Sequence, residues 1–239
     1  MPNGLYAAAA GAQNQERVLD TVANNLANAS SAGFKGQRVT FREVLVGQVA
    51  GGQARETVRY SVPAEVQTDF RTGNLQDTGR PLDAAIRGSG FFAVQTAEGE
   101  AYTRAGSFVP SPDGVLTTLD GKPVLGNDGP ISLQAVESVQ IMEDGTVNTP
   151  NGPLGQLRVV DFAAPQNLER VGEGLWRAQN NQQPRDLQPN LEVGVVEQSN
   201  VNIMENMTRM IAASRSFESM HRVIQVYRDV DAKTANELK

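Results

Sequence analysis

Cysteine is absent from the 239 residues, and histidine occurs once, at position 221. The missing thiols exclude disulfide bridges and thiolate metal sites. A Ser-His-Asp or Cys-His catalytic unit would have to include His221, which falls on the apolar stripe of an expected C-terminal helix. We therefore expect His221 to be a packed residue rather than a catalytic base.

Aromatic residues make up only 5 % of the chain and hydrophobic residues 39 %, which predicts one modest core. The N-terminal region has no apolar run longer than Tyr6–Ala10, and no basic segment precedes an apolar one there. We therefore expect no membrane insertion and no cleaved secretory signal. The net charge of −6 has no long run of one sign, which argues against a nucleic-acid partner.

The first 35 residues predict a helix with a narrow apolar seam at alternating three- and four-residue steps. Such spacing is typical of coiled coils. Gly33 fits the position just after a helix end, where a positive φ costs nothing for glycine, and Phe34 can fold back onto the last turn. The alternative is an ordinary amphipathic helix packed on its own domain. The seam positions are Leu5, Ala8, Ala12, Gln15, Leu19, Val22, Leu26 and Ala29.

The C-terminal part predicts a second, longer helix. Asn202, followed by Glu205 three residues later, resembles a capping box, and no glycine or proline follows Gly194. Acid-before-base pairs four residues apart, such as Glu205 and Arg209, support the helix surface. Its apolar stripe consists of Ile203, Met207, Met210, Ser214, Phe217, His221 and Ile224.

The middle of the chain predicts an antiparallel β domain. Glycine and proline are frequent between Gly47 and Gly194, and Asp-Gly or Asn-Gly turns recur between short strand-forming runs. The runs are "VRYSV", "FFAVQ", "VLTT", "VQIM" and "LRVVDF". The turns are Asp113-Gly114, Asp120-Gly121, Asp144-Gly145 and Asn151-Gly152. Trp176 is expected in the core of this domain.

Nothing in this domain indicates an enzyme, and we expect no catalytic, cofactor-binding or metal-binding residues. "RGSGFF" (87–92) lacks the third glycine and the following helix of a dinucleotide loop, so a tight β-turn is the better interpretation. The aspartates at 113, 120, 128 and 144 sit at turn positions, and their spacing matches no calcium loop. Two carboxylates could still meet in space, so a glycan hydrolase is kept as a remote alternative.

Four stretches together resemble the bacterial flagellar basal-body rod and hook proteins. The first is "NNLANASSAGFKG" (24–36), and the second is "GNLQDTGRPLDAAIRGSGFFAV" (73–94). The third is "YTRAGSFVPSPDGVLTTLDGKPVLG" (102–126), and the fourth is "EQSNVNIMENMTRMIAASRSFES" (197–219). They follow the order of the family and span nearly the whole chain.

The resemblance implies an α+β protein whose long terminal helices pair as a coiled coil around a central antiparallel β-rich domain. Residues 1–35 and 197–239 would form the inner layer of a tubular assembly, 36–72 a connecting segment and 73–196 the outer layer. The resemblance also implies a structural rod subunit that transmits torque. Its partners would be copies of itself, other rod proteins and the type III export apparatus. Its location would be the periplasmic basal body, reached without a cleaved signal.

Within the family, the short span from Gly47 to Gly73 and "RPLDAAI" (80–86) favour a proximal-rod member over a distal-rod member. The hook protein itself is disfavoured because 239 residues leave no room for its extra domains. A third class of function is a β-domain adhesin or binding module that oligomerises through its ends.

We expect the assembly interface to lie on both helices and on their ends. Asparagines 24, 25 and 28 would face adjacent subunits, where buried amides fix the register; solvated surface residues are the alternative. Gly33 and Phe34 would turn the chain out of the inner layer, and Asn200 and Asn202 would start the return helix. The full set is Leu19, Val22, Asn24, Asn25, Leu26, Asn28, Gly33, Phe34, Asn200, Asn202, Met207, Met210, Phe217 and Ile224.

Overall fold

The computed structural model describes residues 2–46, 58–133, 138–172, 174–179 and 182–237. The chain divides into two compact units. A helical unit combines residues 1–27, 37–68 and 202–239, and a β unit combines residues 28–36 and 69–201. Helices at the two ends and an antiparallel β-rich middle confirm the predicted α+β class.

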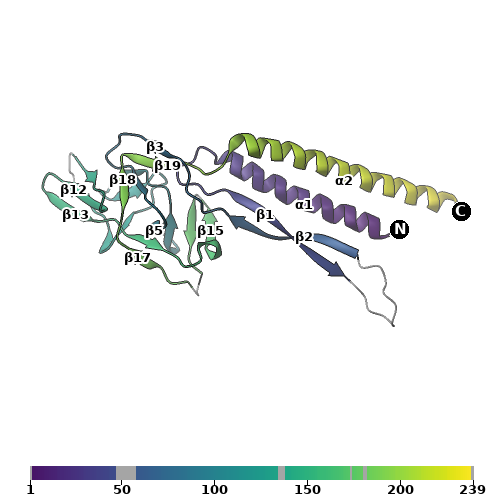
Figure 1. Ribbon diagram of the computed structural model, residues 1–239, viewed down its shortest axis with the longest axis horizontal. Coiled ribbons are helices and arrows are strands. Elements are labelled where there is room, and N and C mark those ends of the chain that lie inside the picture. Colours follow the sequence, from purple (N-terminus) through teal and green to yellow (C-terminus); the bar gives the residue numbers. More distant parts are fainter. Residues whose placement is uncertain (1, 47–57, 134–137, 173, 180–181, 238–239) are drawn as a thin grey trace. The chain divides into compact units, whose positions relative to one another are not determined.

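The helical unit is built on α1 (Pro2–Ala27) and α2 (Ile203–Glu237), which lie side by side and run in opposite directions (Figure 1). The close approaches Gly4–Tyr227 and Gly11–Met220 lie near the start of α1. A β-carbon on Gly4 would lie 2.8 Å from Cζ of Tyr227, so any larger residue there would require the tyrosine ring to shift. A long C-terminal helix was predicted, and α2 confirms it.

A long β-hairpin packs against α1 in the same unit. Strands β1 (Gln37–Val46) and β2 (Val58–Thr68) pair antiparallel from Gln37 opposite Thr68 to Val46 opposite Val58. The register shifts between Thr40 and Phe41, beside Pro63, whose missing N–H cannot continue the ladder. The expected connecting segment, 36–72, therefore includes this hairpin.

The helix ends differ in how well they follow the prediction. α1 ends at Ala27, six residues before Gly33, so Gly33 is not the residue just after the helix. Turns begin at Asn28, whose carbonyl accepts from Ser31 N–H at 3.1 Å, and they end α1 early. The positive φ expected at Gly33 is confirmed, at +67°. Oδ1 of Asn202 accepts from the N–H of Glu205 at 3.1 Å and caps α2, as predicted.

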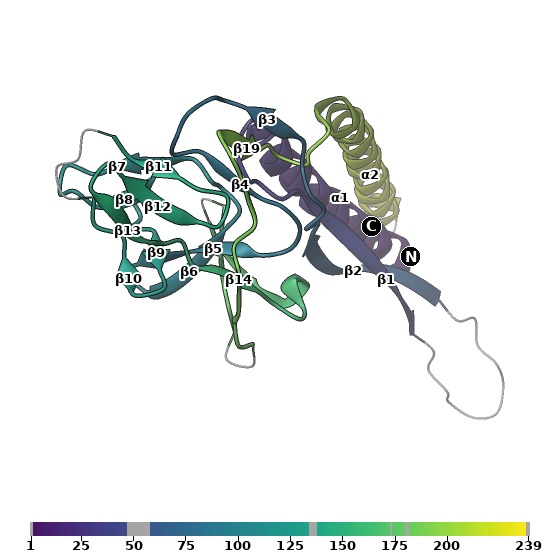
Figure 2. The same cartoon turned by 60° about the vertical axis from the view of Figure 1, so that its left-hand side comes forward.

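The β unit contains the remaining strands, all paired antiparallel (Figure 2). Its largest sheet has the order β15-β16-β6-β5-β14-β17, and the other strands form small pairs and one three-stranded sheet. The strand bounds are β3 (Leu75–Asp77), β4 (Ala84–Ile86), β5 (Phe91–Thr96), β6 (Gly99–Thr103), β7 (Phe108–Pro110), β8 (Leu116–Thr118), β9 (Leu125–Gly126), β10 (Gly129–Pro130), β11 (Gln140–Ile141), β12 (Thr146–Thr149), β13 (Gly152–Gln156), β14 (Val159–Asp161), β15 (Glu169–Gly172), β16 (Leu175–Arg177), β17 (Arg185–Leu187), β18 (Leu191–Val193) and β19 (Val195–Glu197); a short 3-10 helix, η1, spans Pro165–Asn167.

Strand β5 separates two apolar clusters because successive side chains of a strand point to opposite faces. Phe92 and Val94 belong to the larger cluster, and Phe91 and Ala93 belong to the smaller one. Trp176 is buried in the smaller cluster, as predicted, with its ring centroid 5.6 Å from that of Phe91. The β unit therefore buries apolar residues on both faces of its main sheet.

The predicted turns are confirmed, because the glycines of all four Asp-Gly and Asn-Gly pairs have positive φ. Asp144 also behaves as a turn residue: its Oδ1 accepts from the N–H of Thr146 at 2.9 Å. That hydrogen bond lowers the pKa of the Asp144 carboxyl. "RGSGFF" forms a bend with positive φ at Gly88 and Gly90 between β4 and β5; these strands do not pair with each other, so the bend is not a hairpin turn.

Candidate assembly surfaces

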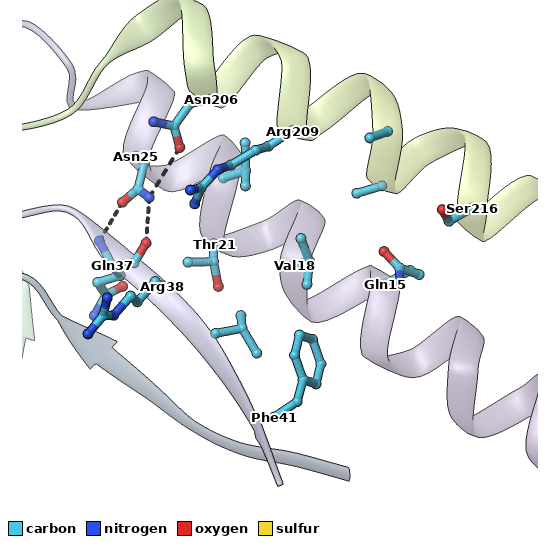
Figure 3. A pocket seen from close by; sticks show the side chains of 14 residues that line it. Gln15, Val18, Thr21, Asn25, Gln37, Arg38, Phe41, Asn206, Arg209 and Ser216 are labelled. Carbon is cyan, nitrogen blue, oxygen red and sulfur yellow. Dashed lines mark hydrogen bonds between the residues drawn. The ribbon is translucent and has the colours of Figure 1, made fainter. Parts of the chain in front are cut away.

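Asn25 connects three elements of the helical unit. Its Oδ1 accepts from the backbone N–H of Gln37 at 2.8 Å, and its Nδ2 donates to the carbonyl of Gln37 at 2.7 Å. Nδ2 also lies 3.5 Å from Oδ1 of Asn206 on α2. The side chain is 4 % exposed, so both backbone groups of Gln37 are satisfied by a buried amide (Figure 3). Asn25 is therefore used within its own chain, whereas its role between subunits stays a prediction.

Next to Asn25 lies a groove of about 340 Å³ between α1, α2 and β1 (Figure 3). Val18 of α1 and Phe41 of β1 line it, and Phe41 remains 47 % exposed. Arg209, which lines the groove from α2, is paired with Glu205 at 2.5 Å. The groove is thus a mixed apolar and polar surface open to solvent.

The β unit contains a buried ionic cluster where chain segments distant in sequence meet. Nζ of Lys35 donates to Oε1 of Glu197, 162 residues away, and to the carbonyl of Arg71 at 2.8 Å. Oε2 of Glu197 lies 3.6 Å from Nη1 of Arg104. The side chains of Lys35 and Glu197 have no exposed surface, and that of Arg104 is 5 % exposed. One buried carboxylate therefore serves two buried cations.

Burial decides the electrostatics of this cluster. It lowers the pKa of the Lys35 ammonium below its ordinary value, and Glu197 offsets part of that shift. Burial also lowers the pKa of the Arg104 guanidinium, which donates to the carbonyl of Gly88 at 2.6 Å and lies over the ring of Phe91. Removing Glu197 would leave both cations in a dry interior.

Asn200 and Gly33 complete this junction within the β unit. Oδ1 of Asn200 accepts from Gly36 N–H at 2.8 Å, and its Nδ2 donates to the carbonyls of Asp69 and Arg71 at 2.7 and 3.0 Å. Gly33 N–H donates to the carbonyl of Glu197 at 2.7 Å. The incoming segment 33–36 and the outgoing segment 197–200 are therefore hydrogen-bonded together.

Space at Gly33 is restricted as well as its backbone conformation. A β-carbon there would lie 2.6 Å from Cα of Ala105, which is closer than β-carbons approach in proteins. Phe34 is buried within the β unit, under the guanidinium of Arg170 at 4.8 Å from the ring centroid. This packing within the β unit was not predicted; the expected contact was with the last turn of the N-terminal helix.

The remaining predicted interface residues divide into buried and exposed sets. Val22 is buried, and Leu19, Leu26, Phe217 and Ile224 are half-buried in the helical unit. Asn24 is exposed and Asn28 is half-buried. Met207 and Met210 are 47 % and 36 % exposed. His221, expected to be packed, is exposed with its ring against that of Phe217, because α2 turns it away from α1.

The sequence reading missed the ionic cluster of Lys35, Arg104 and Glu197. Lys35 directly follows Phe34 in a stretch with few charges, which was the one available signal. Among the described residues, no group of three or more histidines, aspartates or glutamates is placed to hold a metal ion. In the described residues no helix has the length and apolar character needed to cross a membrane.

Comparisons with known proteins place these features in a family. A model described as "Flagella basal body rod protein" matches residues 5–35. One for the "Flagellar hook protein FlgE/F/G D1 domain" matches 85–149, and one for the "Flagellar basal body rod FlgEFG protein C-terminal" matches 192–238. The three matched ranges cover the terminal helices and part of the β unit.

Full-length relatives agree with these matches. The chain is 36 % identical over 251 residues to the flagellar basal-body rod protein FlgG of Bacillus subtilis, covering 94 % of each chain. It is 36 % identical over 254 residues to FlgF of Escherichia coli, covering 100 % of this chain and 98 % of FlgF. It is 31 % identical over 227 residues to FlgF of Caulobacter vibrioides, covering 94 % and 93 %.

The chain therefore belongs to the flagellar basal-body rod protein family. It is a structural subunit of the rod and not an enzyme, since its relatives are named as rod proteins. Its similarity to FlgF and to FlgG is about equal, and both are consistent with the resemblance seen in the sequence.

Proposed function

We propose that this subunit builds the proximal rod, in the manner of FlgF, and transmits torque along the axis of the flagellum. The observation that carries the proposal is the helical unit itself, in which helices from both chain ends pack together while large apolar side chains of α2 stay exposed. Such a unit has surface left for neighbours. In this proposal residues 1–35 and 197–239 form the inner layer and 73–196 the outer layer, and residues 28–35 and 197–201, which pack with the β unit, form the junction between the layers.

The two helices pair as a coiled coil in this proposal. Their contacts Gly4–Tyr227, Gly11–Met220 and Asn25–Asn206 advance by whole multiples of seven residues on both helices. A seven-residue repeat is the period of a left-handed coiled coil. The same register would continue through every subunit of the rod.

The partners are copies of this chain and other rod proteins, stacked around a common axis. Met207, Met210 and Asn24 are exposed in the single chain and would be covered by neighbours. Leu19, Val22, Leu26, Phe217 and Ile224 would hold the helix pair together, while Asn25, Asn28, Gly33, Phe34, Asn200 and Asn202 would fix where it begins and ends.

The route to the periplasmic rod would be the flagellar type III export apparatus, without a cleaved signal. The seam between the helices supports this, since its buried residues on α1 include small Ala8 and Ala12. A helix pair with so little buried area is marginal in isolation and can pass unfolded through a channel.

Deletion of this chain tests the function. We expect cells without it to be non-motile and to yield basal bodies that lack a complete rod. Full motility of the deletion strain would contradict the proposal. Electron microscopy with a short epitope inserted at the exposed Ala97-Glu98 turn then separates the two positions: label near the inner membrane supports the proximal rod.

The distal rod is the second candidate, because the chain matches FlgG as well as it matches FlgF. The short span after the N-terminal signature favours the proximal position, although residues 47–57 of that span lie outside the described part of the chain. Label near the outer rings in the same experiment would favour the distal position.

A further inference from the structure

Large apolar side chains gather on the first turns of α2. Met204 is 73 % exposed, Ile211 56 % and Met207 47 %, and Ile203 and Met210 are exposed beside them. Exposed apolar side chains this close together mark an interaction surface rather than scattered surface residues. Methionine fits irregular partner surfaces because its unbranched side chain adapts.

This surface continues along α2 as one stripe with three zones, at steps of three or four residues. The first zone is apolar and contains Met204, Met207 and Ile211. The second is charged and the third is apolar again. We call it the outer stripe of α2, and it consists of Met204, Met207, Ile211, Arg215, Glu218, Arg222 and Val226, all exposed.

α1 also carries a stripe with apolar ends and a charged middle on its side away from the buried seam. Small alanines lie near its C-terminal end, and two acids and a glutamine follow toward the N-terminus. An alanine and the 70 % exposed Tyr6 lie near the N-terminal end. We call it the outer stripe of α1, and it consists of Tyr6, Ala9, Gln13, Glu16, Asp20, Ala23 and Ala27. Ala9 is half-buried and the other members are exposed.

We propose that the outer stripe of α2 binds the outer stripe of α1 of a second copy of this chain. The helices run antiparallel in the register that α1 and α2 already use within the chain. Met204 then lies beside the second copy's Ala27 and Arg215 beside its Glu16, while Val226 falls within one residue of its Tyr6. This inference rests on the proposed rod function, since it supplies one subunit contact of that assembly.

Size and charge both favour this partner. Long methionines against alanines let two helices approach closely, because large side chains fill the space that small ones leave. Within the described part of the chain, no ion pair involves Glu16, Asp20 or Arg215. Glu16 of one copy and Arg215 of the next are therefore available to each other, and Asp20 lies one turn away, opposite Ile211. In the same register the amide of Gln13 would lie opposite Glu218 and can donate to its carboxylate.

The contact uses different surfaces on its two sides, so it does not close on itself. A head-to-tail interface of this kind generates rings or open helical arrays, depending on the rotation between copies. Each added copy presents a free α2 stripe again, which suits a growing axial structure.

Disulfide cross-linking in motile cells tests the contact, and the absence of native cysteine makes the background clean. The test chain carries Ala27→Cys together with Met204→Cys, and the control chain carries Gln13→Cys together with Met204→Cys. Gln13 lies on the same stripe two heptads away, so it reports register. After mild oxidation we expect dimers and higher multimers from the test chain, at least about tenfold more than from the control.

Equal yields from both chains, or no multimers in motile cells, would overturn the contact. A cross-link to a different protein, recognised by its mass, would overturn the second copy as partner. These outcomes can be told apart from failure of the proposed rod function. That failure would be seen in the deletion strain, as full motility of cells that lack this chain.

Exchanging the charges of Glu16 and Arg215 provides a second test that does not depend on cysteine cross-linking. Glu16→Arg should reduce the swimming zone in soft agar to less than half, because it places a second guanidinium opposite Arg215 of the next copy. Arg215→Glu in the same chain should restore it, since every copy supplies both stripes. An unchanged zone for Glu16→Arg, or no restoration by the double variant, would contradict the proposed register.

Discussion

The helical unit and the β unit differ in how completely they bury their large apolar side chains. In the β unit Trp176, Phe92 and Phe108 are almost fully enclosed, and a buried ionic cluster joins its first and last segments. In α2, by contrast, Asn206 and Ala213 are the buried residues among those described, and three methionines, Met204, Met207 and Met210, are exposed. A unit that encloses its own apolar side chains is stable alone, whereas one that leaves them exposed depends on its neighbours.

Hydrogen exchange on the free chain should show this difference most strongly. We expect amides of β5, β6 and β14 to exchange about 100-fold or more slowly than those of α1 and α2, since local opening of the helices exposes little apolar area. Mass spectrometry of peptides from dilute protein measures the exchange rates of the strands and of the helices in one experiment. Equal protection throughout would mean that the helix pair is already stable before assembly.

Gly33→Val should be the most damaging single change in the β unit. The valine would combine a positive φ with a backbone clash, and we expect a loss of about 4 kcal/mol or more, or failure to fold. Urea unfolding followed by the fluorescence of Trp176 measures it. Gly79→Val is the matched control, because Gly79 has φ of +64° but no atom within 4 Å of its β-carbon position. A similar loss at both positions would show that the clash at Gly33 is unimportant.

Glu197→Leu should cost the β unit about 3–5 kcal/mol, because it leaves Lys35 and Arg104 buried without their counter-ion. The same Trp176 signal reports it. Glu98→Leu removes an exposed partner of Arg177 and should change the free energy of unfolding by no more than about 1 kcal/mol. If Glu197→Leu were as mild as its control, the cluster would not stabilise the unit.

Asn25→Leu tests the helical unit. The variant leaves the backbone N–H and carbonyl of Gln37 without their buried partner, and we expect a loss of about 2 kcal/mol. Faster exchange of the Gln37 amide and a lower melting temperature in far-ultraviolet circular dichroism would show it. Asn24→Leu changes an exposed asparagine next to it and should have a smaller effect. Unchanged motility in Asn25→Leu cells would contradict its expected role in assembly.

Asn202→Ala should have the smallest effect of the series, about 1 kcal/mol, because it removes the hydrogen bond that caps α2. Exchange of the first amides of α2 should become faster. Asn202→Asp keeps an acceptor at the same place and should restore slow exchange; if it does not, the cap contributes little.

Local sequence patterns predicted the helices and turns well, but they could not predict contacts between residues far apart in the sequence. The extent of α2, its cap at Asn202, the Asp-Gly turns and the positive φ of Gly33 follow from residue types at fixed spacing. The predicted apolar stripe of α2 was wrong in part, because Ile203, Met207, Met210 and His221 are exposed. The residues of α2 that are buried or approach α1 are instead Asn206, Ala213, Met220 and Tyr227. The end of α1 at Ala27 was missed because the asparagines and serines after it are compatible with either a turn or a continuing helix.

The candidate surfaces were predictable only in part. Asn25 was singled out from the sequence, but its partner Gln37 was not, since nothing local indicates that a strand returns beside the helix. The pairing of Lys35 with Glu197 spans 162 residues and depends on the whole β unit being folded. A single sequence carries no signal for such a meeting.

The place where the chain enters the β unit is also the place where it leaves. Gly33 and Glu197 share a backbone hydrogen bond, and Asn200 holds both Gly36 and Asp69. A module whose entry and exit coincide can be grafted, enlarged or exchanged without altering the length of either flanking segment. Evolution could therefore vary the β unit of such subunits as an interchangeable insert, while the two terminal helices stay the same.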